Sequence, residues 1–115
     1  MQRKHLRFGK GFRVAIGNER SQAAEMVLAP GSKEGDAEND HRGSDQWLFV
    51  VSGTGSAIVN GHRYTLNPGS IFLIEKGDKH EIRADATELL QTLNIYVPPA
   101  YTNDGDTLPA GERGG

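Results

Sequence analysis

The sequence predicts an all-β domain, built as one antiparallel sandwich or barrel. First, residues 11–98 read as short segments rich in β-branched and aromatic residues, separated by glycine, asparagine or proline turns. Second, none of these segments has a convincing helical period. Third, Asn60-Gly61 lies between two short β-type segments, and both residue types tolerate the positive φ of a type I′ hairpin turn.

Eight strands are expected, in the order 12–16, 24–28, 47–51, 57–59, 63–66, 71–75, 80–83 and 89–97. The polar turn Gly17-Asn18-Glu19-Arg20 joins the first two. Residues 19–26 include helix-forming types, but we favour a strand because the flanking pattern is β. Pro30-Gly31 begins a polar stretch, 32–45, that is expected to be a long loop. The last strand ends at Pro98-Pro99, because proline cannot donate to a ladder.

The length of 115 residues predicts a single domain over residues 1–101, with its core at about 12–98 and a flexible tail at 102–115. The sequence has no cysteine, which excludes disulfide scaffolds, thiolate zinc sites and cysteine nucleophiles. A formal net charge of −2 and the lack of long apolar runs predict neither nucleic acid nor membrane as a partner. We expect the protein to be cytoplasmic.

Two histidines and an amide are the candidates for chemistry: His41 in a polar turn, Gln46 at the start of an apolar strand, and His80 after the turn at Gly77. Side chains on adjacent strands can converge inside a barrel, because residues two apart point the same way. Such a group describes either a metal centre or a clamp for a polar ligand. The plainer alternatives are a loop histidine without a role and a buried amide that satisfies backbone groups.

The strand and turn pattern over residues 12–98 resembles the cupins, which are small jelly-roll proteins. The family's first motif carries His-x-His, a glutamate and a glycine; aligned on Gly53, these positions hold Asn39, His41 and Gln46. The second motif matches at Gly61, Pro68-Gly69, Gly77 and His80, and departs from the family at Glu75 and Ala84. The resemblance therefore implies an antiparallel double-stranded β-helix with an altered first metal motif.

The resemblance also implies a divalent transition metal (Fe, Ni, Mn, Zn or Cu) held by His41, Gln46 and His80 with Asn39. Asp45 is a substitute carboxylate if the turn shifts the register by one residue. Apolar residues are expected to line the pocket: Leu48, Val50, Ile71, Leu73 and Ile82. If a strand faces the other way, the residues next to these in the sequence would line the pocket instead.

The function implied is that of a metal-dependent enzyme of the dioxygenase, isomerase or decarboxylase class, acting on a small organic molecule. The alternative is a non-catalytic module that binds a small ligand or a metal. Strands with apolar residues on both faces predict a homodimer, because an exposed face carrying Trp47, Phe49 or Phe72 would form a patch that monomers rarely leave open.

Overall fold

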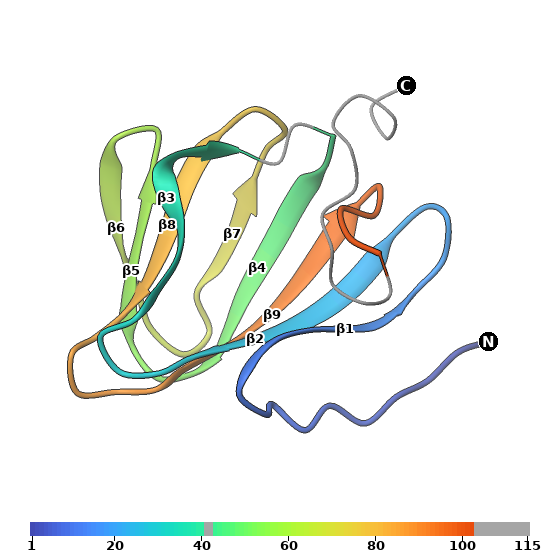
Figure 1. Cartoon of the computed structure of the whole chain (residues 1–115), viewed down its shortest axis with the longest axis horizontal. Coiled ribbons are helices and arrows are strands. Elements are labelled where there is room, and N and C mark those ends of the chain that lie inside the picture. The colour runs from blue at the N-terminus through green and yellow to red at the C-terminus, as the bar shows by residue number, and fades with distance from the viewer. Residues whose placement is uncertain (41–42, 103–115) are drawn as a thin grey trace.

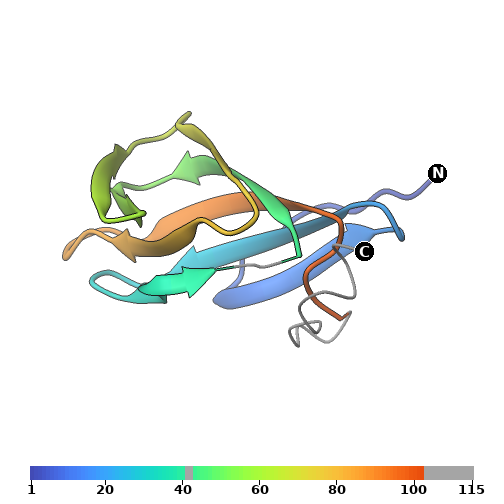
Figure 2. The same ribbon diagram turned by 90° about the horizontal axis from the view of Figure 1, so that it is seen from above.

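The structure is a computed structural model that describes residues 1–40 and 43–102, without the side chains of residues 36–40. Nine strands form two antiparallel sheets that face each other (Figures 1 and 2), and the described residues contain no helix. The expected all-β jelly-roll class is confirmed. Within the described residues there is accordingly no helical segment able to cross a membrane.

The larger sheet has five strands in the order β1-β2-β9-β4-β7. Their bounds are β1 Gly11–Gly17, β2 Gln22–Leu28, β4 Asp45–Ser52, β7 Ile71–Ile74 and β9 Leu90–Val97. The smaller sheet has four strands in the order β3-β8-β5-β6. Their bounds are β3 Lys33–Asp40, β5 Gly55–Val59, β6 His62–Leu66 and β8 Lys79–Ala84. Because neighbours in space are rarely neighbours in sequence, most strands are tied into the fold by long-range pairing.

The core lies between the sheets and is selected by strand alternation. In β4, Gln46, Leu48 and Val50 are buried, whereas Trp47 and Phe49 point outward. Inward-facing side chains from both sheets complete the core: Met26, Leu28, Ala57, Leu66, Ile74, Ile82, Ala84 and Leu90. The two layers thus exclude water from the polar side chains that are buried between them, which include Gln46, His80, Thr92 and Asn94.

The expectation of a long loop over residues 32–45 is wrong, because residues 33–40 form β3. This strand pairs only with β8 and lies at the edge of its sheet. An edge strand keeps one side in water and therefore tolerates a polar, charged sequence that a central strand would not. Two other predictions are confirmed: the strand expected at residues 24–28 forms as part of β2, and Asn60 and Gly61 have φ values of 49° and 83°, as a type I′ turn requires.

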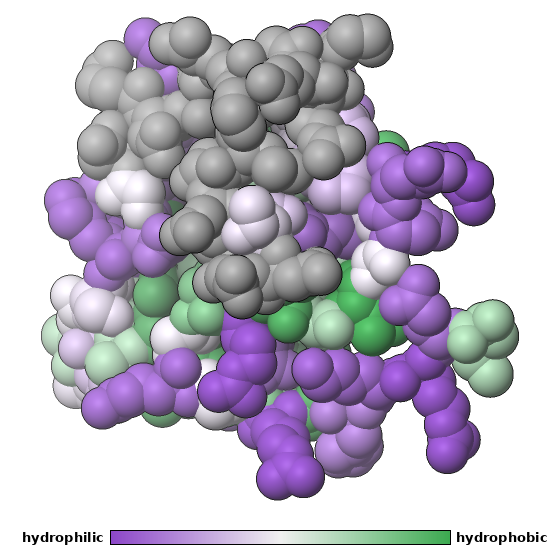
Figure 3. Space-filling model, turned by 45° about the vertical axis from the view of Figure 1, so that its right-hand side comes forward, coloured by the Kyte–Doolittle hydropathy of each residue, from purple (hydrophilic) through white to green (hydrophobic). Residues whose placement is uncertain are grey.

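The outer face of the five-stranded sheet carries six exposed apolar side chains, which we call the outer-face patch: Trp47, Phe49, Val51, Ile71, Leu73 and Val97. The ladder places them together, since Phe49 lies opposite Ile71 and Trp47 lies opposite Leu73. On the face drawn in Figure 3, polar side chains gather along the right side and the bottom, with apolar side chains visible between them.

Candidate functional site

A cavity of about 40 Å³ lies between the two sheets, near one end of the sandwich. Gln46 reaches it from β4 in the larger sheet, and His80 reaches it from β8 in the smaller one. The other lining residues are Phe12, Met26, Glu34, Gly35, Ile82, Tyr96 and Tyr101. A space of this size holds about one water molecule or one ion. Two residues that sequence reasoning singled out, 34 positions apart, therefore share one cavity.

His80 is positioned by a clasp between two turns. Asn60, in the β5–β6 hairpin, accepts a hydrogen bond from Lys79 N at its Oδ1 (3.0 Å) and donates from Nδ2 to Asp78 Oδ1 (2.9 Å). Its backbone nitrogen also donates to Lys79 O at 2.8 Å. The clasp fixes the residue before His80, and the pairing of His80 with Val59 then directs the imidazole inward, where it is buried.

Gln46 is held by a chain of buried polar groups on the inner face of the larger sheet. Its Nε2 donates to Asn94 Oδ1 at 2.9 Å, and Asn94 Nδ2 donates to Thr92 Oγ1 at 3.0 Å. The Thr92 hydroxyl donates in turn to the backbone oxygen of Met26 at 3.3 Å. The remaining polar atom of the amide, Gln46 Oε1, is buried and has no hydrogen-bond partner among the described residues.

Two tyrosines and a glutamate give the cavity its remaining polar character. The ring centroids of Tyr96 and Tyr101 lie 5.1 Å apart in an edge-to-face arrangement, and the Phe12 ring lies tilted against Tyr101 with its centroid 4.6 Å away. Burial, followed by the neighbouring Tyr101, raises the pKa of Tyr96 well above its usual value, and burial also raises the pKa of Tyr101 to about 12. The Glu34 carboxylate raises both pKa values further, so both phenols stay protonated at neutral pH.

The chain after β9 is tied back onto β2 beside this cavity. Gln22 Oε1 accepts hydrogen bonds from the backbone nitrogens of Ala100 and Tyr101, both at 3.2 Å, and Gln22 Nε2 donates to Tyr101 O at 2.7 Å. Ser44 Oγ donates to Pro98 O at 2.7 Å. These bonds hold the Tyr101 ring against the cavity, where it forms part of the wall.

The other residues predicted as metal ligands or as a substitute ligand are His41, Asn39 and Asp45. His41 lies outside the described residues, and the side chain of Asn39, in β3, is not described either. Asp45 does not take the place of Gln46: its Oδ1 accepts a hydrogen bond from Lys76 N at 2.8 Å, next to the β7–β8 turn. The register therefore turns Gln46 inward and leaves Asp45 to stabilise that turn.

Of the residues expected to line the pocket, Ile82 does so, while Leu48 and Val50 are buried deeper in the core. Ile71 and Leu73 need correction. They lie exposed in the outer-face patch, because alternation along β7 turns their neighbours Phe72 and Ile74 inward. Phe72, expected on an exposed face, packs instead on the core and meets Tyr64 edge to face.

Sequence reasoning missed five residues of the site: Glu34, Thr92, Asn94, Tyr96 and Tyr101. Thr92, Asn94 and Tyr96 share parity along β9, which was the available signal, but the strand was interpreted as apolar on both faces. Glu34 was missed because its segment was taken for a loop. It lies opposite Ile82 in the β3–β8 ladder and therefore shares the inner face with that residue.

Among the described side chains, no three or more from His, Cys, Asp and Glu come close enough to hold a metal ion together. The donors on the cavity nevertheless suit a transition metal, since an imidazole nitrogen is a common ligand and an amide oxygen is a neutral, weaker one. The buried Gln46 Oε1 is the observation that favours a bound group, because a buried acceptor left without a partner is costly.

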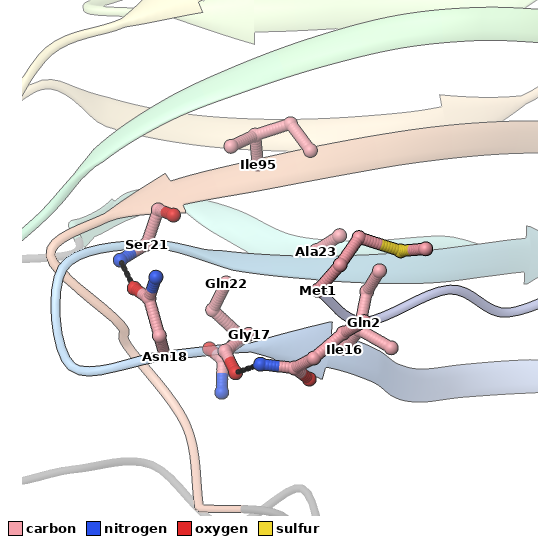
Figure 4. A pocket seen from close by; sticks show the side chains of 9 residues that line it. All are labelled: Met1, Gln2, Ile16, Gly17, Asn18, Ser21, Gln22, Ala23 and Ile95. Atoms are coloured by element: carbon pink, nitrogen blue, oxygen red, sulfur yellow. Dashed lines mark hydrogen bonds between the residues drawn. The ribbon is translucent and has the colours of Figure 1, made fainter.

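A larger hollow of about 410 Å³ lies where the N-terminal segment meets the β1–β2 hairpin (Figure 4). Gln2 Nε2 donates there to Gly17 O at 2.9 Å, and Ser21 N donates to Asn18 Oδ1 at 3.0 Å. The side chains lining it are amide, hydroxyl, thioether and aliphatic groups, none of which ionises. It therefore offers no side chain for acid–base chemistry, and the inner cavity remains the stronger candidate site.

Comparisons with known proteins agree with this fold. In sequence, the chain is 34% identical over 76 residues to 5-aminosalicylate 1,2-dioxygenase from a Comamonas species, covering 56% of this chain and 20% of that protein. It is 32% identical over 53 residues to L-ectoine synthase from Mycobacteroides abscessus, covering 46% of this chain and 39% of the synthase. The chain thus spans less than half the length of these relatives.

Solved structures resemble it over more of its length. A cupin protein from Bacteroides fragilis has a TM-score of 0.73 at 17% identity, covering 94% of this chain and 95% of its own. A protein from Bacillus halodurans has a TM-score of 0.75 at 20% identity, covering 88% and 77%. These likenesses show the fold, and the family model described as "Cupin domain" matches residues 24–96, more than half of the chain. The protein therefore belongs to the cupin family.

Proposed function

We propose that the protein binds a divalent transition-metal ion in the inner cavity, and that this ion acts on a small organic molecule that reaches it from outside the cavity. The observation that carries the proposal is the buried, unpartnered Gln46 Oε1 on a cavity that His80 also lines. His80 and Gln46 would hold the ion. An ion bound by so few charged ligands stays a strong Lewis acid, which suits reactions of oxygen-bearing substrates.

The protein's own groups have separate roles in this proposal. The carboxylate of Glu34, which lines the cavity and is exposed to solvent, would supply negative charge that imidazole and amide ligands do not bring to a metal ion. Tyr96 and Tyr101 hydrogen-bond to one another through their side chains, and this pair of protonated phenols forms a polar part of the cavity wall. The inner-face core around Ile82 would keep water away from the buried side chains of Gln46 and His80.

Metal content tests the binding step. The protein is loaded separately with Fe²⁺, Mn²⁺, Co²⁺, Ni²⁺, Cu²⁺ and Zn²⁺, desalted, and assayed for bound metal. We expect His80→Ala to lose the ion, while His62→Ala, which removes an exposed histidine on β6, retains it. Gln46→Glu should bind more tightly, because it restores a charged ligand. A wild-type protein without stoichiometric metal, or a His80→Ala variant that binds as well as wild type, would contradict the proposal.

The small size of the cavity favours a second candidate function, a module that holds an ion or small ligand without turnover. About 40 Å³ does not enclose an organic substrate. Oxygen uptake by the metal-loaded protein, with 5-aminosalicylate and related hydroxylated aromatic acids as test compounds, separates the two. Uptake that His80→Ala abolishes supports the enzyme, whereas metal binding without turnover of any test compound supports the module.

We propose in addition that the protein is a homodimer joined through the outer-face patch. The six side chains are 39–61% exposed, which leaves roughly 500 Å² of apolar surface. In a homodimer interface that is about 65% apolar, such a patch corresponds to roughly 800 Å² per protomer, the area that a standard stable interface buries. A second copy of the chain is therefore an occupant of matching size and character.

A further inference from the structure

We propose that Thr92 and Asn94, which do not line the cavity, determine which end of the Gln46 amide faces it. A glutamine amide has a donor end and an acceptor end of nearly the same shape. Only the acceptor end binds a cation, whereas the donor end repels it. The inference deepens the proposed metal site and rests on that proposal for its ligand.

The backbone oxygen of Met26 determines which group donates and which accepts in this series of hydrogen bonds. The oxygen of Met26 belongs to the backbone and can only accept a hydrogen bond, so the Thr92 hydroxyl uses its single proton to donate to it. The hydroxyl oxygen then acts as the acceptor for Asn94, which must present Nδ2 (3.0 Å). Presenting Nδ2 on that side directs Asn94 Oδ1 toward Gln46.

The last step fixes Gln46. Facing an acceptor at 2.9 Å, its amide must present Nε2, which leaves Oε1 as the polar atom without a partner in the protein. The strand register supports this arrangement, because Leu48 lies opposite Asn94 and Gln46 opposite Tyr96, so Gln46 and Asn94 are diagonal neighbours on the inner face.

The burial of these residues makes the arrangement robust. Thr92 and Asn94 are fully buried, so water does not compete for their hydrogen bonds. Reversing Asn94 would set its Nδ2 against Gln46 and its Oδ1 against a hydroxyl whose proton is already committed to Met26. Thr92 and Asn94 are thus positioning residues that make the cavity wall an acceptor for cations and hydrogen-bond donors.

Two variants of one residue test the inference, with Co²⁺ alone as the probe in isothermal titration. Thr92→Val removes the hydroxyl and keeps the shape, which frees Asn94 and Gln46 to reverse. Thr92→Ser keeps the hydroxyl and loses only a methyl group. We expect Thr92→Val to bind Co²⁺ about 10- to 100-fold more weakly, as is usual when a group that orients a ligand is lost. Thr92→Ser should stay within about threefold of wild type by the same reasoning.

Equal Co²⁺ affinity in wild type and Thr92→Val would overturn the inference, and so would an equal loss in both variants, which would point to packing. A metal-independent measurement is made on the wild-type protein by NMR. We expect a scalar coupling across the hydrogen bond from Gln46 Nε2 to the side-chain carbonyl carbon of Asn94, and its loss in Thr92→Val. If the wild-type protein binds no Co²⁺, the proposed metal site is wrong, but the scalar coupling still reports the direction of the Gln46 amide. Absence of that coupling in the wild-type protein would overturn the inference.

Discussion

Replacing Ile71 by lysine tests the proposed dimer most directly. Ile71 is the most exposed side chain of the outer-face patch, at 61%, and lies opposite Phe49 in the ladder. That fraction corresponds to about 100 Å² of apolar surface, worth about 2.5 kcal/mol when buried. A two-fold interface contains the residue twice, so the variant loses about 5 kcal/mol, or more than a thousandfold in Kd.

The assay is sedimentation velocity across a range of protein concentrations. We expect wild type to sediment at twice the chain mass of 12.5 kDa and Ile71→Lys at the mass of one chain. Thr65→Lys is the control, since it adds the same charge at an exposed position on β6 in the other sheet. Thermal unfolding should show that Ile71→Lys still folds, because an exposed substitution changes stability by only about 0.5 kcal/mol. A wild-type protein that is monomeric at every concentration, or an Ile71→Lys variant with unchanged association, would refute the reasoning.

Two further predictions concern stability. The folded protein holds the phenolic protons of Tyr96 and Tyr101 more tightly than the unfolded chain does, because both pKa values are raised. The free energy of unfolding should therefore be highest below pH 10 and fall as the pH rises toward about 12. Denaturant titrations of Tyr101→Phe should show a smaller fall with pH, and an unchanged pH dependence would contradict this prediction. Gly55→Ala should lower the free energy of unfolding by about 3 kcal/mol, because the added Cβ would lie 2.1 Å from Arg83 O. Gly9→Ala is the control, since the nearest atom to its added Cβ lies at 3.6 Å. Equal melting temperatures for the two variants would contradict this prediction.

The sequence predicted most of the fold because strand alternation and turn chemistry are local. The burial of Gln46, Leu48 and Val50 along β4 follows from parity alone, and the Asn60-Gly61 turn from its residue types. The edge strand β3 was not predictable in this way, because its pairing with β8 joins residues that lie 39 to 50 positions apart in the sequence.

The candidate site was predicted in part. His80 and Gln46 were found because both stand at motif positions, and they do line one cavity. The series of hydrogen bonds from Thr92 through Asn94 to Gln46 was not predicted. A buried polar side chain needs a hydrogen-bond partner, and Asn94 finds one of its partners, Gln46, on another strand. Periodicity along β9 does not reveal such partners, and its more apolar residues face outward instead.

The clasp between the two turns has a practical consequence for anyone who alters this protein. A hairpin tip is ordinarily the place where a peptide tag, a fluorophore or a few extra residues do little harm. Here Asn60 holds Asp78 and Lys79, the two residues just before His80. An insertion at this tip would release that imidazole from its place, so labels belong elsewhere on the molecule.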